Sequence, residues 1–187
     1  MTDTTLSNPT LPILKQQFVH VKLVASEFRG QTTVVIPTEN LYEIMSFLRN
    51  DPRCAYNFLC DVTGVDYLNY PSVSGAPDGR FGVIYMLTSH AHNTRLTVKV
   101  MLTPSFDTSG IDEDPALHLA SVVNLWPGAE WPEREVFDMF GIRFNNHPDL
   151  RRILTWETYP GHPLRKDYPV TGRGEREAYQ YVDKDSV

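Results

Sequence analysis

The chain has little cysteine: Cys54 and Cys60 are the only two in 187 residues. Two thiols cannot by themselves complete a structural zinc site or hold an iron–sulfur cluster. We expect both to be buried free thiols. A redox pair is the alternative, and the lack of a secretion signal disfavours it.

Long apolar runs and basic leaders are also missing. No stretch approaches the roughly 20 apolar residues that span a bilayer. Residues 1–12 contain no lysine or arginine, so neither a secretory signal nor a transit peptide is indicated, and we expect the protein to fold where it is made. The net charge of -6 argues against a dedicated nucleic-acid binder.

Nucleotide and hydrolase motifs are absent as well. Gly172-Arg173-Gly174 lacks the preceding strand and following helix that a dinucleotide fingerprint requires, and there is no Walker sequence. The nucleophile elbow of the α/β-hydrolases is missing too. What the chain does have is the composition of an ordinary globular protein, with 41% apolar and 21% charged residues.

Three regions differ in character: a polar lead-in at residues 1–17, a core domain at 18–144 and an arm at 145–187. The core begins with a strand at 18–24, a hairpin turn at Gly30 and a strand at 31–36. A helix follows, with Thr38 as N-cap, and ends at Asp51-Pro52. Its apolar residues recur at helical spacing: Leu41, Ile44, Met45 and Leu48.

The rest of the core alternates between strands and helices. Residues 56–67 predict a strand with a turn near Gly64, and residues 81–87 and 95–102 predict a hairpin. Pro115 opens an apolar helix over 116–126. A short acidic helix is predicted to start at Glu130 or Pro132 and to run to Phe140, where Gly141 ends it. Together these predict an α+β fold: a mostly antiparallel sheet with helices on one face, followed by an extended irregular C-terminal arm.

The arm is punctuated by proline and glycine, and residues 127–187 carry nine of the 17 lysines and arginines. The arm also contains Trp156, Tyr159 and Tyr168. Large aromatic side chains are usually buried in folded proteins, which argues against simple disorder. We therefore interpret residues 145–187 as an arm that becomes ordered on a partner protein, and expect protease to digest it first in the isolated chain. Arginine, tryptophan and tyrosine are the residue types enriched at interface hot spots.

Charged side chains are densest at residues 133–141. On a helix, Glu135 and Asp138 share a face, as do Arg134 and Asp138. Such paired carboxylates could do acid–base chemistry, as in a free-standing hydrolase. We favour ion pairs that pin the arm to the core. The expected participants are Glu133, Arg134, Glu135 and Asp138 on the helix, and Arg151, Arg152 or Arg165 on the arm.

Two histidines precede prolines in the arm region, His147 and His162. A metal site built from them and Asp149 is conceivable, because imidazole and carboxylate are zinc ligands. The spacing matches no metal pattern, so we interpret both His-Pro steps as rigid turns. His90 and His92 fall in a hairpin turn, where we expect exposure.

Two long blocks carry a family resemblance. Residues 133–154 contain Glu-Arg-Glu-x-x-Asp-Met-Phe-Gly and then His-Pro-Asp-Leu-Arg-Arg-Ile-Leu, and residues 161–169 read Gly-His-Pro-Leu-Arg-Lys-Asp-Tyr-Pro. This pattern resembles the C-type subunit of the proton-pumping NADH–quinone oxidoreductase, respiratory complex I. Weaker similarity at 60–67 and 121–131 extends the resemblance over about residues 35–170.

The resemblance implies a subunit of the quinone-reducing module that carries no cofactor, metal or catalytic residue. Partner subunits would hold FMN and iron–sulfur clusters, and quinone would be the substrate of the complex. The implied partners are a D-type quinone-pocket subunit, a B-type iron–sulfur subunit and an 8-iron ferredoxin-like subunit, at the cytoplasmic side of the bacterial inner membrane. The alternative is the equivalent subunit of a membrane-bound hydrogenase or of a complex with another electron donor.

Within the resemblance, twelve residues are implied to have structural or interface roles. They are Glu133, Arg134, Glu135, Asp138, His147, Asp149, Arg151, Arg152, His162, Arg165, Lys166 and Asp167.

Overall fold

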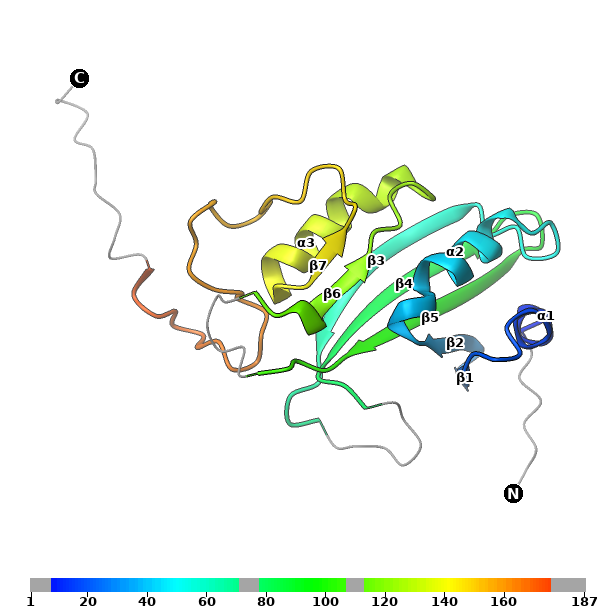
Figure 1. Ribbon diagram of the computed structural model, residues 1–187, viewed down its shortest axis with the longest axis horizontal. Helices are drawn as coiled ribbons and strands as arrows, with labels where there is room; N and C mark the ends of the chain where they lie inside the picture. The colour runs from blue at the N-terminus through cyan, green and yellow to red at the C-terminus, as the bar shows by residue number, and fades with distance from the viewer. Residues whose placement is uncertain (1–7, 71–77, 107–112, 176–187) are drawn as a thin grey trace.

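The computed structural model describes residues 8–70, 78–106 and 113–175 (Figure 1). Most of the loop expected after residue 70, and the end of the arm at residues 176–187, lie outside the described residues.

A five-stranded sheet forms the centre of the molecule, with strand order β1-β2-β5-β4-β3. The strands are β1 (Val24–Phe28), β2 (Gln31–Ile36), β3 (Phe58–Asp66), β4 (Phe81–Ser89) and β5 (Thr94–Leu102). Three pairings are antiparallel, but β2 and β5 run parallel. The sheet is therefore mixed, and the expectation of a mostly antiparallel sheet is only partly right. The helix between β2 and β3 carries the chain across the sheet, which permits the parallel pair.

One face of this sheet makes the core. Alternate residues of β4 and β5 are buried, among them Val83, Tyr85, Val98 and Val100, as expected for a sheet with one covered face. Helices α2 (Leu41–Asn50) and α3 (Glu130–Phe140) lie over the same face of the sheet (Figure 1). A small parallel pair, β6 (His118–Ala120) with β7 (Arg143–Asn145), flanks α3.

The positions of the helices follow the spacing of apolar residues and the places where helix-ending residues occur. The predicted apolar residues of α2 are fully buried: Leu41, Ile44, Met45 and Leu48. Thr38 is not the N-cap of this helix, because a 3-10 turn, Thr38–Asn40, precedes it. Gly141 ends α3 in the left-handed conformation, with φ of 74°, as the sequence predicts. Among the described residues, no helix is both long enough and apolar enough to cross a membrane.

The lead-in contains a helix of its own, α1 (Thr10–Gln17). Leu11 and Leu14 from α1 are buried in the core, so the short apolar cluster in this region packs against the domain. The strand predicted at 18–24 is wrong: the chain turns at 19–20, and β1 starts only at Val24. The hairpin turn at Gly30 is confirmed, with φ of 73°.

Two other local predictions are wrong. The apolar stretch at 116–126 is a 3-10 turn, Pro115–Leu117, then β6 and a loop. Burial alternates over residues 116–121 with a period of two, which is typical of a strand and not of a helix. Gly64 is no turn and lies inside β3. A Cβ atom at Gly64 would come within 2.5 Å of Phe140 Cδ2, so the glycine allows α3 to approach the strand.

The two cysteines also differ from each other. Cys54 is buried, and burial raises the pKa of its thiol to about 11. Cys60 is exposed on β3, so the expectation that both are buried is wrong. Both are free thiols.

Candidate functional site

The arm is attached to the core at the Asp138 carboxylate. Asp138 is fully buried on α3, and its two oxygens accept five hydrogen bonds from residues 152–155. Three of the donors are successive backbone amides, those of Ile153, Leu154 and Thr155, at 2.7 to 3.0 Å. The other two are the Thr155 hydroxyl and Arg152 Nη1, the latter at 2.7 Å. The arm thus wraps its backbone around one carboxylate.

These bonds decide the charge of Asp138. Burial works to raise its pKa, but the hydrogen bonds from Thr155, Arg152 and Leu154 outweigh burial and hold the pKa below its usual range. The carboxylate is therefore ionised and saturated with donors. It cannot act as a catalytic base in this geometry, which removes one of the two groups that a hydrolase would need.

The C-terminal end of α3 forms the second attachment. Helix ends leave carbonyl oxygens without intrahelical partners, and the partial negative charge there attracts cationic groups. His162 Nδ1 donates to the Asp138 carbonyl at 2.9 Å, and Arg165 Nε donates to the Phe140 carbonyl at 2.7 Å. The Leu164 amide donates to the Met139 carbonyl at 3.1 Å. Three consecutive carbonyls are thereby capped by the arm.

Burial perturbs both side chains at this helix end. It lowers the pKa of His162 to about 4, so the ring is neutral at physiological pH. It also lowers the pKa of Arg165 to about 10, although the guanidinium stays charged. Gly141 leaves room for both, because a Cβ atom there would come within 2.6 Å of His162 Nε2. This site has the structural character of a helix cap.

A third attachment joins the arm to the end of β3. Asp66 is buried and pairs with Arg80 at 2.9 Å. It also accepts the Lys166 backbone amide at 2.8 Å, and Arg80 pairs with Asp167 at 2.8 Å. Burial opposes ionisation of Asp66, but its bonds to Arg80 and Lys166 outweigh that effect and lower its pKa. Residues about one hundred positions apart are thus linked by two acids and one arginine.

Arg134 makes a fourth link without an ion pair. Its guanidinium donates to the backbone carbonyls of Arg151 and Arg152 at 3.0 and 3.1 Å. Arg151 pairs with Asp149 on the surface at 2.6 Å.

The expected ion-pair network is thus smaller than the sequence suggested. Asp138–Arg152 is the one pair, within the described residues, that joins an acid of α3 to an arginine of the arm. Glu133 points elsewhere, with its carboxylate on Ser121 and Val122. Glu135 is exposed.

The candidate metal residues are held apart by α3. His147 Nε2 donates to the Glu130 carbonyl at the start of the helix, whereas His162 bonds at its end. Asp149 donates its backbone amide to His147 Nδ1, which supports a rigid turn. In the part of the chain that the structure describes, no group of three or more histidine, cysteine, aspartate or glutamate residues could hold a metal ion.

Sequence reasoning missed Asp66, Arg80 and Thr155 as participants. Asp66 lies in the segment at residues 60–67 that resembles the family, so that similarity could have identified Asp66 as a participant. Arg80 adjoins a loop and carries no local signal, since its role depends on a contact made by Asp167.

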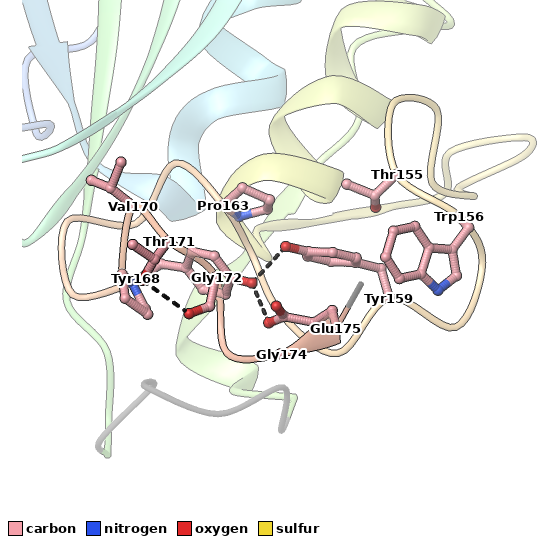
Figure 2. A pocket seen from close by; sticks show the side chains of 11 residues that line it. Thr155, Trp156, Tyr159, Pro163, Tyr168, Val170, Thr171, Gly172, Gly174 and Glu175 are labelled. Carbon is pink, nitrogen blue, oxygen red and sulfur yellow. Dashed lines mark hydrogen bonds between the residues drawn. The ribbon is translucent and has the colours of Figure 1, made fainter. Parts of the chain in front are cut away.

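Beyond the attachments, residues 155–175 of the arm line a pocket of about 690 Å³ (Figure 2). The Tyr168 hydroxyl lies between the Tyr159 hydroxyl and the Glu175 carboxylate and bonds to both. The Trp156 ring packs edge-on against Tyr159, with 4.5 Å between ring centroids. The remaining residues that line the pocket are Thr155, Pro163, Pro169, Val170, Thr171, Gly172 and Gly174.

Comparison with known proteins agrees with the resemblance seen in the sequence. Residues 34–174 match the family described as the respiratory-chain NADH dehydrogenase, 30 Kd subunit. The chain is 44% identical to the C-type subunit of the NADH-quinone oxidoreductase of Citrifermentans bemidjiense, over 93% of this chain and 96% of that one. It is also 44% identical to the C-type subunit of the Bartonella henselae enzyme, over 76% of this chain and 62% of that one.

Solved structures have the same fold. A trypsin-resistant fragment of Nqo5 superposes with a TM-score of 0.57 at 31% identity, covering 74% of this chain and 97% of the fragment. A chain of an archaeal membrane-bound sulfane sulfur reductase superposes with a TM-score of 0.62 at 18% identity, covering 94% and 97%, which shows the fold alone. With three quarters of its length matched by the family and close relatives along nearly all of it, the chain belongs to the family of the 30 kDa subunit of respiratory-chain NADH dehydrogenase.

Proposed function

We propose that this chain is a scaffold and assembly subunit of NADH–quinone oxidoreductase and that its arm, residues 145–187, binds a neighbouring subunit. In this role the chain carries no cofactor. FMN and iron–sulfur clusters belong to partner subunits, and quinone is the substrate of the whole complex.

One observation carries the proposal: the arm is fastened at its backbone yet exposes large apolar side chains. Leu154 is 64% exposed, Leu164 is 52% exposed and Val170 is fully exposed. Each lies within a few residues of an attachment to the core, at Asp138, Met139 or Asp66. Exposed apolar side chains held in fixed positions are suited to docking, because little conformational entropy remains to be lost on binding.

The proposed partners follow from the family. We assign the arm to a D-type quinone-pocket subunit, and the rest of the interface to a B-type iron–sulfur subunit and an 8-iron ferredoxin-like subunit. The complex would hold the chain at the cytoplasmic side of the inner membrane. The twelve residues implied by the resemblance keep their proposed structural and interface roles, with Asp138, Arg152, His162 and Arg165 shaping the arm.

The test compares two substitutions of the same residue type. Val170→Asp places a charge on the arm, and Val19→Asp places the same charge at a site that is 71% exposed beside α1. Each tagged chain is expressed in cells lacking the native subunit, and the membranes are assayed for co-purifying subunits and NADH–quinone reductase activity. We expect Val170→Asp to lower recovery of partners severalfold, while Val19→Asp matches the wild type. Equal recovery with both variants would contradict an arm-centred interface.

A further inference from the structure

Glu133 is a buried acid with an unusual set of partners. It projects from α3 into the core with no exposed surface. Oε2 accepts the Ser121 hydroxyl at 2.6 Å, and Oε1 accepts the Val122 amide at 2.8 Å. Both donors are neutral, and within the described residues no basic side chain forms an ion pair with Glu133. A buried carboxylate without a cation is costly, which favours its protonated form.

A second buried polar group lies nearby. Tyr85 in β4 is fully buried, and its hydroxyl has no hydrogen-bond partner in the described part of the chain. Burial raises the pKa of Tyr85, and the charge of Glu133 adds to the effect, so the two groups are electrostatically coupled. A protonated carboxyl must donate its hydrogen, and Ser121 Oγ, 2.6 Å from Oε2, is an oxygen able to accept it. Tyr85 is thus a titratable group of the sheet whose electrostatics depend on the charge of Glu133.

Asp138, five residues further along α3, has the opposite environment. It has Arg152, a hydroxyl and three amides as donors, and its pKa is lowered. Burial raises the pKa of Glu133 to about 7, despite the bonds from Ser121 and Val122 that work to lower it. One helix therefore carries two buried acids whose surroundings separate their protonation states.

We propose that Glu133 holds a proton in the folded chain near neutral pH and acts as a proton-dependent latch between α3 and the loop at residues 121–123. In the neutral state its hydrogen bonds to Ser121 and Val122 hold the helix to this loop. Ionisation places an uncompensated charge in the core and loosens the helix on which the arm is anchored through Asp138. The latch makes arm attachment weaken as the surroundings become alkaline.

The sign of the effect on stability follows from linkage. The folded chain keeps the Glu133 proton up to about pH 7, whereas an unfolded glutamate loses it near its usual 4.5. Stability from this group therefore falls as pH rises from about 5 to 7 and then levels off. His162 works the other way between about pH 4 and 6.5, because its folded pKa is lowered to about 4. A comparison of variants removes the contribution of His162.

The experiment measures urea unfolding of the full chain at pH 5, 6, 7 and 8 for the wild type, Glu133→Gln and Glu135→Gln. Glu135 is the matched control, since it lies on the same helix and is exposed. Between pH 5 and 8, we expect the unfolding constant of the wild type to rise by about 100-fold relative to Glu133→Gln. Glu135→Gln should keep a constant ratio to the wild type. A constant ratio for Glu133→Gln as well would overturn the proposal.

A second measurement remains decisive even when Glu133→Gln folds poorly. Carbon-13 NMR of glutamate carboxyls in the wild type should show one group that titrates near neutral pH. Ser121→Ala removes a hydrogen bond to Glu133 and should move that titration upward. If every glutamate in the wild-type chain titrates below about pH 5, the latch does not exist.

Discussion

Replacing Asp138 with asparagine tests the arm attachment most severely. The substitution keeps the size of the side chain but removes the charge that pairs with Arg152, whose side chain is only 11% exposed. It also replaces one accepting oxygen by a donating amide in a ring of five donors. Removing one partner of a buried ion pair lowers the free energy of unfolding by about 3–5 kcal/mol. That is a large share of the roughly 5–15 kcal/mol by which a typical domain is stable.

Arg152→Ala should cost less than Asp138→Asn. The carboxylate keeps four donors when the arginine is removed, so the loss is about 1.5–3 kcal/mol, the usual worth of a hydrogen bond to a charged group. The double variant should cost less than the sum of the two, because both changes remove the same pair. Asp149→Asn is the control: its pair with Arg151 is at the surface, so stability should not change.

Urea unfolding of the full chain, followed by tryptophan fluorescence, gives these free energies. The contribution of Asp138 should be present at neutral pH and lost as pH falls through its lowered pKa, because the unfolded acid takes up its proton at higher pH. Should Arg152→Ala prove the more damaging change, or should Asp149→Asn match Asp138→Asn, the backbone amides around Asp138 are not what holds the arm.

Three further outcomes follow from the geometry. Gly64→Ala should lower stability by about 1–3 kcal/mol in urea unfolding, because the new methyl group meets Phe140; an unchanged midpoint would refute this contact. A maleimide should label Cys60 quickly and Cys54 only after unfolding, as mass spectrometry of the native chain can show; two fast thiols would contradict the burial of Cys54. Trypsin should cut the isolated chain at Arg173, which is exposed, before it cuts at Arg152 or Arg165, whose side chains bond to the core; earlier cutting at either would count against the attachments.

Local patterns in the sequence predict much of the core. Residues 31–36, the hairpin of β4 and β5, and α3 with its Gly141 cap all follow from spacing and turn residues. Tertiary packing decides the rest. The parallel pairing of β2 with β5 depends on how the chain crosses the sheet, and no local signal encodes that choice. Gly64 is explained by a ring some 75 positions away, not by a turn.

The same division holds for the site. Charge spacing on α3 and the arginines of the arm indicate an ion pair, and Asp138–Arg152 is present. Composition cannot tell that Asp138 binds three backbone amides, because backbone donors leave no trace in residue types. Composition also cannot show that the Glu133 side chain points into the core, because its bond to the Ser121 hydroxyl depends on how the chain folds.

The central claim is that this chain works as a subunit of an NADH–quinone oxidoreductase, and purification of the tagged chain tests it most directly. The wild-type chain is recovered from gently solubilised membranes of its source, identified by mass spectrometry with its partners, and assayed for NADH-dependent quinone reduction. The account predicts recovery with iron–sulfur and quinone-pocket subunits together with that activity. Recovery as a monomer, or with a nickel-containing subunit and no NADH activity, would contradict it.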